Sequence, residues 1–538
     1  MQKKTKFHTL VFCFYLLVCF SLYFITRNAG FVDDYIGFEA NYDRCGLLHY
    51  YSCSGSTNLR FFQHVFTFAL YRLFGSEHIA WYVVYCILHT VAAYLSFVVL
   101  RKLLKIFEQQ NPTEIAFFAA LLFLISPYQT EVVVWRVCIQ YMVVYICMLL
   151  SVLLILQEHK NYFFTLIFIG IILFIVALFS IEQAIIIPFV LLAIVFILFI
   201  GKKDFFDKKF VATLFVSQLF VIAIFFSLSK IIYHKWIMHY GSQVFTNFFS
   251  IDTFSRFLKY FLKYIFLLRQ WNYNTAYSIY EFICKPVVFY SLLILLIVSC
   301  VYACKKYLIR NLRFGFILLM ILMYALSLFP VLQLYLSTLL LVEGDRLGYI
   351  SSVFIFAIFI YFIYQFHKTI ARVIVIVFVC LNLFFLIQTN KDWNLSQQIL
   401  TSYNNSYQFK ARKIFVLATP ENYKGIYLIR TKAGLAEILK YRANKIIQQD
   451  FIDVVHFNQC SFNDGIKVEK ENDSTLVIGF TKTGNWFWRD ALGASDYSNQ
   501  DFKYRTADWN SKVTLRNFDP KQDIIIYPDS SKWKQFVW

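Results

Sequence analysis

The protein has 538 residues, of which 59% are hydrophobic, 20% aromatic and only 15% charged, whereas soluble globular proteins average about 25% charged residues. Even a soluble chain of about 300 residues buries only about 75% of the surface that its unfolded form exposes, so this composition excludes an ordinary soluble enzyme. The high hydrophobicity excludes a disordered chain, and the 17 Gly and 8 Pro exclude a collagen-like or Gly/Ser-rich fibre. The lipid bilayer must be the main solvent of this chain.

The net charge of +19 is not concentrated in one basic patch. Lys and Arg form short clusters between apolar segments, which is typical of membrane topology and not of nucleic-acid binding. The clusters are Lys3, Lys4 and Lys6; Arg101, Lys102 and Lys105; Lys202, Lys203, Lys208 and Lys209; Lys305, Lys306, Arg310 and Arg313; and Lys368 and Arg372. We therefore expect membrane lipids and no nucleic acid as partners.

Eleven apolar segments are each long enough to cross about 30 Å of hydrocarbon as a helix. They are residues 8–26, 78–100, 115–134, 137–156, 163–180, 184–200, 210–229, 286–304, 314–330, 349–366 and 373–389. With the N-terminus in the cytoplasm, the basic clusters fall on the cytoplasmic side, as the positive-inside rule requires, and the C-terminus lies outside. Residues 1–389 are thus predicted to be an all-α, multi-pass membrane domain, and a bacterial cytoplasmic membrane is the expected location.

Two long outer loops, residues 27–77 and 231–285, are predicted between these spans. In the second loop, apolar residues from Phe254 to Phe266 recur three and four positions apart, which predicts a helix lying on the membrane surface. Lys259 and Lys263 lie off its apolar face, as expected for such a helix. The alternative is a further span interrupted by charges. In the first loop, Cys45 and Cys53 could form a disulfide if the loop faces an oxidising compartment.

After residue 390 charged residues become frequent and the apolar segments become short. Strands are predicted at Ile414–Leu417, Thr475–Phe480, Val513–Leu515 and Asp523–Tyr527, and a helix at Ala433–Ile447. Residues 390–538 are therefore predicted to be a small α+β domain outside the membrane.

Acidic residues and arginines gather near span ends on the predicted outer side, although a charge in hydrocarbon costs several kcal/mol. They are Asp33, Asp34, Arg60, Glu131, Arg136, Glu182, Glu343, Asp345 and Arg346. Each of them alone could be an interfacial anchor. Together they could converge on one cavity at the outer membrane surface, which would suit a substrate with a lipid tail and an anionic head.

Such a cavity could transfer a sugar from a phospholipid carrier. The carboxylate of Asp33 or Asp34 could take the proton of an acceptor hydroxyl, and an arginine could stabilise the leaving phosphate by bidentate hydrogen bonds. An in-line attack with a single base implies inversion at the sugar carbon.

Five segments in this order resemble one family of membrane enzymes. They are FVDDYIGF at 31–38, SPYQTEVVVWRV at 126–137, SIEQAIIIP at 180–188, VEGDRLGYISS at 342–352 and KDWNLSQQIL at 391–400. They resemble the GT-C class of polytopic glycosyltransferases, most of all the protein O-mannosyltransferases and the transmembrane O-mannosyltransferases with tetratricopeptide repeats. The repeat tail of the latter is absent here, so the C-terminal domain inherits no role from it.

This resemblance implies a role for the acidic pair and for Arg346. Asp33 or Asp34 would be the catalytic base, and Arg346 would contact the donor phosphate. The other residues expected to bind donor phosphate or substrate are Arg136, Arg60, Glu131, Glu182 and Glu343. The family also implies a polyprenyl-phosphate sugar donor, and the acceptor could be a glycan, a lipid or a protein.

Three further questions stay open at the level of sequence. Asp33, Asp34 and Glu182 could bind a divalent metal, which some GT-C enzymes use and others do not. One alternative function is a transporter or flippase for a lipid-linked glycan. Ionisable residues near mid-membrane, such as His89, would favour it. The second alternative function is an O-antigen-type polymerase or ligase.

Overall fold

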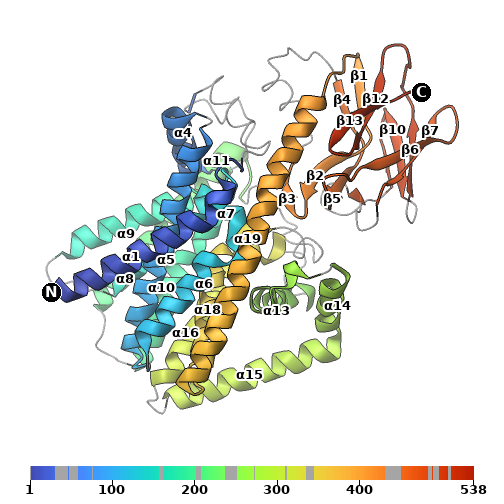
Figure 1. The fold of residues 1–538 in the computed structure, drawn as a ribbon. Helices are drawn as coiled ribbons and strands as arrows, with labels where there is room; N and C mark the ends of the chain where they lie inside the picture. Colours follow the sequence, from blue (N-terminus) through green and yellow to red (C-terminus); the bar gives the residue numbers. More distant parts are fainter. Residues whose placement is uncertain are drawn as a thin grey trace. The chain divides into compact units, whose positions relative to one another are not determined.

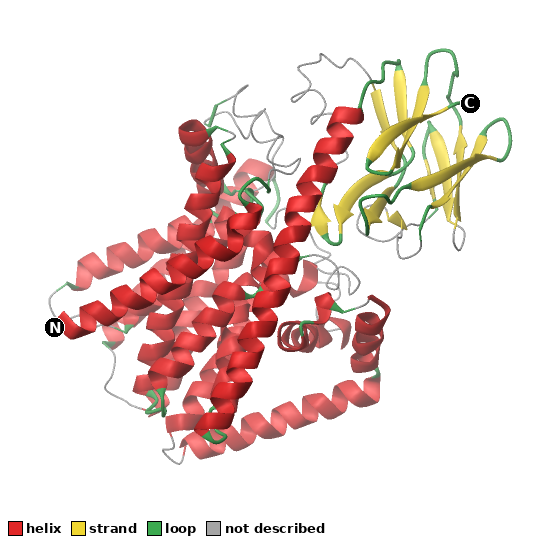
Figure 2. Cartoon of the chain, in the orientation of Figure 1, coloured by secondary structure: helices red, strands yellow, loops and turns green. Residues whose placement is uncertain are grey.

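The structure of the protein is a computed structural model with two compact units. It describes residues 2–30, 46–47, 59–75, 77–156, 162–201, 207–236, 251–271, 273–308, 312–334, 344–429, 450–482, 487–488, 496–506 and 510–538. Unit 1 comprises Met1–Phe24, Tyr51–Val133 and Cys138–Thr389, and unit 2 comprises Ile25–Tyr50, Val134–Val137 and Asn390–Trp538. Helices dominate unit 1, whereas unit 2 carries the strands (Figures 1 and 2).

The helices of unit 1 follow the apolar segments of the sequence. They are α1 (Gln2–Tyr23), α4 (Phe61–Phe74), α5 (His78–Ile106), α6 (Pro112–Ile125), α7 (Thr130–Val134), α8 (Ile139–Ile155), α9 (Phe163–Leu178), α10 (Ile187–Gly201), α11 (Lys208–Tyr233), α13 (Ile251–Phe266), α14 (Tyr273–Cys284), α15 (Pro286–Leu308), α16 (Leu312–Leu328) and α18 (Tyr349–Ile363). The helix α19 (Lys368–Ser406) begins in unit 1 and continues into unit 2.

The chain is a multi-pass membrane protein, but the predicted number of eleven spans is not confirmed. Within the described residues, eight helices are long and apolar enough to cross a membrane, and α8 and α9 are apolar but have only 17 and 16 residues. The predicted span 115–134 is bent by 55° between α6 and the segment Pro127–Val134. Proline disfavours helical geometry in the residue before it, and Ser126 is accordingly extended, with φ −65° and ψ 132°.

Short 3-10 helices connect the spans at one end of unit 1. They are η2 (Pro127–Gln129), η3 (Glu182–Ile186), η4 (Leu268–Gln270), η5 (Phe329–Leu334) and η6 (Asp345–Gly348). η2 packs against η6, η3 packs against η5, and α13 packs against η4, η5 and α18. Segments far apart in the sequence are thereby brought to the same end of the helices, and two of them, η3 and η6, carry the predicted site residues Glu182 and Arg346.

The described strands of unit 2 form three sheets. The first has the order β13-β12-β1-β4, the second β6-β7-β11-β10-β9 and the third β3-β2-β5-β8. The strands are β1 (Lys413–Val416), β2 (Thr419–Tyr423), β3 (Ile426–Tyr427), β4 (Asp450–Asp453), β5 (His456–Gln459), β6 (Ile466–Lys470), β7 (Thr475–Phe480), β8 (Phe487–Trp488), β9 (Tyr497–Ser498), β10 (Phe502–Thr506), β11 (Asn510–Leu515), β12 (Ile524–Asp529) and β13 (Lys532–Phe536).

All four predicted strands are present. β7 has the predicted bounds, β1 and β12 are shifted by one or two residues, and β11 begins three residues before the predicted Val513. The predicted helix Ala433–Ile447 and the predicted cysteine pair Cys45 and Cys53 lie outside the described residues.

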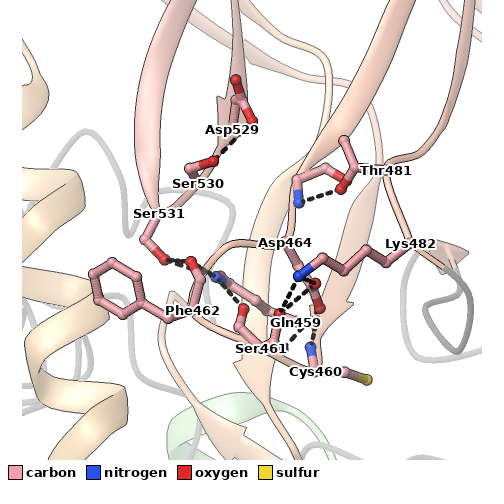
Figure 3. Close-up of polar contacts among 11 residues, drawn as sticks. Gln459, Cys460, Ser461, Phe462, Asp464, Thr481, Lys482, Asp529, Ser530 and Ser531 are labelled. Atoms are coloured by element: carbon pink, nitrogen blue, oxygen red, sulfur yellow. Dashed lines mark hydrogen bonds and ion pairs between the residues drawn. The ribbon is translucent and has the colours of Figure 1, made fainter.

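A tight turn in unit 2 is held by side-chain hydrogen bonds (Figure 3). Asp529 pairs with Lys532, so only Ser530 and Ser531 join β12 to β13, and their φ angles are 50° and 55°. Asn-Gly is the usual sequence for two such residues. Here the buried Ser531 hydroxyl accepts a hydrogen bond from Gln459 Nε2 at 2.7 Å and donates one to the carbonyl oxygen of Phe462 at 2.5 Å. These bonds favour the left-handed turn and tie it to the end of β5.

Candidate functional site

Three of the predicted site residues lie outside the described residues. They are Asp33 and Asp34, the candidate bases, and Glu343, a candidate binding residue. The remaining five are Arg60, Glu131, Arg136, Glu182 and Arg346.

Glu131 and Arg346 form an ion pair although 215 residues separate them. One carboxylate oxygen of Glu131 accepts a hydrogen bond from the backbone N–H of Arg346 at 2.9 Å, and the other pairs with the Arg346 guanidinium. The Glu131 side chain is 5% exposed and that of Arg346 is 15% exposed. Glu131 lies in α7 just after the bend and Arg346 lies in η6, so the contact of η2 with η6 brings them together.

A second cluster, built on the fully buried Asp345, adjoins this pair in the sequence. The Asp345 carboxylate has no exposed surface, and its two oxygens face Lys263 Nζ at 2.5 Å and the Arg269 guanidinium. Burying an unpaired charge costs several kcal/mol, whereas two cations around one carboxylate offset part of that cost. Lys263 comes from α13 and Arg269 from η4, so the cluster ties both elements to η6.

Tyrosines complete the contact of α13 with the rest of unit 1. Tyr128 accepts a hydrogen bond from the Arg269 backbone N–H at 3.3 Å, and its ring lies 5.3 Å from Lys263 Nζ. The ring of Tyr264 contacts that of Tyr128 at 5.0 Å. Burial raises the pKa of Tyr264 well above its usual value, so its phenol stays neutral. Gly348 permits this packing, because a Cβ there would lie 2.4 Å from the Tyr264 hydroxyl oxygen.

The helix predicted at Phe254–Phe266 is present as α13, but its lysines have unexpected surroundings. Lys259 and Lys263 lie off the apolar face, as predicted, yet both are buried, together with Ser255, Tyr260 and Tyr264. The polar face of α13 therefore packs on the protein. Phe257 and Phe261, on the apolar face, are only partly buried. The reason is charge pairing, because Asp345 gives Lys263 a buried partner.

Arg60 and Glu182 form a separate ion pair. The guanidinium of Arg60 donates to Glu182 Oε2 from Nη2 at 2.8 Å and from Nε at 3.1 Å. The two side chains are 21% and 36% exposed, so water screens them more than it screens the Asp345 cluster. Glu182 opens η3 and Arg60 precedes α4, so this pair joins two further connections of unit 1.

Arg136 belongs to unit 2 by its contacts. Its backbone N–H donates to the Gly30 carbonyl oxygen at 3.1 Å, and its Nη2 donates to the Ala29 carbonyl oxygen at 3.2 Å. A side chain at position 30 would clash, because a Cβ on Gly30, whose φ is +98°, would lie 1.9 Å from the Val134 carbonyl oxygen. Arg136 thus anchors the segment that ends, in the described part of the chain, at Gly30.

The structure therefore brings four predicted residues together in two ion pairs, Glu131 with Arg346 and Arg60 with Glu182. Sequence reasoning missed the roles of Lys263, Arg269 and Tyr128. The sequence did contain a signal for the burial of Lys263. The polar face of α13 combines lysines with tyrosines, whereas the solvent-facing side of a helix usually carries charges of both signs. Arg269 and Tyr128 gave no comparable signal.

Metal binding by Glu182 with the aspartates stays a hypothesis. The Glu182 carboxylate is engaged by Arg60, and Asp33 and Asp34 are not described. Elsewhere in the described ranges, no three His, Cys, Asp or Glu side chains are grouped closely enough to hold a metal ion.

His89, the residue that favoured a transporter, is a hydrogen-bonded core histidine. Its Nε2 lies 3.1 Å from the Leu124 carbonyl oxygen and its Nδ1 lies 2.9 Å from the Tyr349 hydroxyl. Since a carbonyl only accepts, Nε2 carries the proton and Nδ1 accepts from Tyr349. A neutral, fully bonded imidazole ties α5 to α6 and α18, and it gives the transporter reading no specific support.

Comparisons with known proteins leave the family open. The sequence matches no family model and no curated protein sequence. Among solved structures, the chain is similar to the crystal structure of ArnT from Cupriavidus metallidurans bound to undecaprenyl phosphate, with 11% sequence identity, 88% of this chain and 98% of that chain covered, and a TM-score of 0.36. A TM-score this low carries no argument about fold or function.

Proposed function

We propose that this protein is a GT-C type glycosyltransferase that moves a sugar, as a hexosyltransferase, from a polyprenyl-phosphate donor to an acceptor hydroxyl on the outer side of the membrane. The proposal includes the orientation given by the basic clusters, with residues 390–538 outside. The acceptor is a glycan, a lipid or a protein.

The observation that carries the proposal is Arg346, a cation fixed at the end of the apolar helix α18. Glu131 accepts a hydrogen bond from the backbone N–H of Arg346 and also pairs with its guanidinium. The Arg346 side chain is therefore oriented before any substrate binds. An oriented arginine between apolar helices suits a phosphate on a lipid tail, because guanidinium and phosphate form paired hydrogen bonds. Lys263 and Arg269 add positive charge close by.

The chemistry follows from these charges and from the acidic pair in the first outer loop. Asp33 or Asp34 takes the proton of the acceptor hydroxyl as the oxygen attacks the sugar carbon, and the bond from that carbon to the phosphate oxygen breaks. Arg346 stabilises the charge that develops on the leaving polyprenyl phosphate. Attack opposite to the leaving group inverts the sugar carbon.

Arg346 is tested with purified protein in detergent, a panel of polyprenyl-phosphate hexoses and membrane extract as the acceptor source. Release of polyprenyl phosphate is the measurement. We expect Arg346→Ala to raise the donor KM about tenfold or more, since hydrogen bonds to charged groups contribute about 1.5 to 3 kcal/mol. Arg372→Ala is the matched control, because Arg372 also pairs with a glutamate, Glu114, but its side chain is 50% exposed at the start of α19.

Two outcomes contradict the proposal in different ways. Failure of the wild-type protein to release polyprenyl phosphate from any donor rejects the glycosyltransferase activity. An active wild type with an unchanged donor KM in Arg346→Ala rejects the phosphate contact alone.

The base is tested by Asp33→Asn and Asp34→Asn. One of them should lower kcat by at least a hundredfold, because general-base catalysis contributes about 10² to 10⁴, while the donor KM changes little. Circular dichroism and membrane insertion should match the wild type. Full activity in both variants would show that neither aspartate is the base.

A further inference from the structure

We infer that Asp345 is a positioning residue, which sets the place of Arg346 through a buried charge cluster with Lys263 and Arg269. The inference rests on the proposed function, in which Arg346 holds the donor phosphate. According to this inference, α13 and η4, which are not membrane spans, hold the donor site in place.

Asp345 and Arg346 are consecutive residues of one short 3-10 turn, η6, so they move together. Asp345 has no exposed surface and is held by Lys263 Nζ at 2.5 Å and by the Arg269 guanidinium. The next backbone N–H, that of Arg346, is held by Glu131 at 2.9 Å. Carboxylate contacts thus fix this turn from two sides.

The turn begins with a residue that few side chains could replace. Gly344 has φ +81°, a left-handed conformation that glycine adopts without strain. It directs the chain into η6, where the Asp345 carboxylate enters the protein. The conformation of the turn therefore depends on its anchoring contacts, and Asp345 provides the most deeply buried of these.

The same cluster also reaches the partner of Arg346. Arg269, which binds Asp345 through its side chain, donates its backbone N–H to the Tyr128 hydroxyl at 3.3 Å. Tyr128 lies in η2, three residues before Glu131. Loss of the Asp345 carboxylate would leave Lys263 and Arg269 as two buried cations without their shared anion, so α13 and η4 would move away from η2 and η6. Both ends of the Glu131–Arg346 pair would then lose support.

Donor kinetics of Asp345→Asn test the inference. We expect the donor KM to rise at least fivefold, with partial recovery in Asp345→Glu, which keeps the charge. The decisive measurement is made in an Arg346→Ala background, where Asp345→Asn should change the donor KM less than twofold, because a positioning residue has nothing left to position. A merely structural role would lower the yield or stability of the protein and leave the donor KM of the folded fraction unchanged.

Lys263→Met keeps the test usable if Asp345→Asn does not fold. The wild-type cluster has two cations and one carboxylate, so this substitution leaves one carboxylate facing one guanidinium and makes the cluster neutral. It also removes the ion pair that joins α13 to η6. The donor KM should rise at least twofold. Asp523→Asn is the matched control, since Asp523 is a carboxylate with no exposed side-chain surface that pairs with Arg412 in unit 2, and its donor KM should equal that of the wild type.

Two results would overturn the inference: an unchanged donor KM in the folded Asp345 and Lys263 variants, or a full effect of Asp345→Asn in the Arg346→Ala background. Failure of the proposed function is distinguishable from either. In that case, the wild-type protein would release no polyprenyl phosphate from any donor. An active wild type whose donor KM is unchanged by Arg346→Ala would instead reject only the contact of Arg346 with the phosphate.

Discussion

At the scale of single residues, the ion pairs of the site differ in burial, and burial decides how much each contributes to stability. The partly exposed pair of Arg60 and Glu182 resembles surface salt bridges, which stabilise proteins by about 0 to 1 kcal/mol. Asp345 is different, because removing one partner from a buried charge cluster costs about 3 to 5 kcal/mol. Stability measurements should therefore respond far more to Asp345 than to Arg60.

His456 in β5 is a second buried ionic group, outside the site. Its Nδ1 lies 2.9 Å from a Glu421 oxygen and its Nε2 lies 2.9 Å from an Asp453 oxygen. Burial alone would lower the pKa of His456, but the two carboxylates outweigh it and raise the pKa to about 10. The charged imidazolium thus holds β2 and the end of β4 to β5.

The raised pKa of His456 predicts how unit 2 responds to pH. A group whose pKa is higher in the folded state stabilises fully below its unfolded pKa of about 6.5, and loses that contribution as pH rises to about 10. We expect His456→Gln to increase hydrogen exchange in β2 and β5, with the difference from wild type largest near pH 6.5 and vanishing towards pH 10. Exchange is measured by mass spectrometry and corrected for the intrinsic effect of pH. A difference that grows with pH would contradict the prediction, and the exposed His367→Gln is the control.

At the scale of elements, α13 shows how a tertiary contact reverses the expected environment of a helix face. Its apolar spacing predicted the helix correctly, but its polar face contacts Tyr128 of η2 and Asp345 of η6, and the helix packs against α18. Tyr264 packs closely over Gly348, and the Tyr264 hydroxyl has no hydrogen-bond partner among the described residues. A buried hydroxyl without a partner adds nothing to stability.

This close packing of α13 on α18 gives a compensating pair of variants. Gly348→Ala should destabilise unit 1 by about 1 to 3 kcal/mol, because the new Cβ would lie 2.4 Å from the Tyr264 hydroxyl oxygen. Tyr264→Phe should be neutral or slightly stabilising, and the double variant should recover most of the loss. Thermal unfolding in detergent measures all three. A double variant no more stable than Gly348→Ala would show that the hydroxyl is not the obstacle.

At the scale of the whole molecule, the clusters of Lys and Arg predict the orientation in the membrane. Because basic residues collect in the loops that stay in the cytoplasm, the N-terminus should be inside and residues 390–538 outside. Protease added to right-side-out vesicles should then remove an epitope tag at the C-terminus and spare one at the N-terminus. The opposite pattern would reverse the topology and place the proposed site in the cytoplasm.

The sequence by itself determined that this is a membrane protein with a strand-rich C-terminal part, because composition, apolar length and alternating strands are local properties. It also predicted the helix α13 and four of the described strands, of which β7 has the predicted bounds. Local pattern could not give the number of spans, because α8 and α9 are short and Pro127 bends a segment that is continuous in hydropathy.

Only the tertiary structure decided which charges meet. Glu131 and Arg346 are 215 residues apart, and Lys263 finds Asp345 only when α13 folds back on η6. A charged residue near a span end has the same sequence signature whether it anchors the chain in the interface or pairs inside the protein. The difference lies in burial, which removes competing water and makes a partner necessary, and burial is a property of the packed fold.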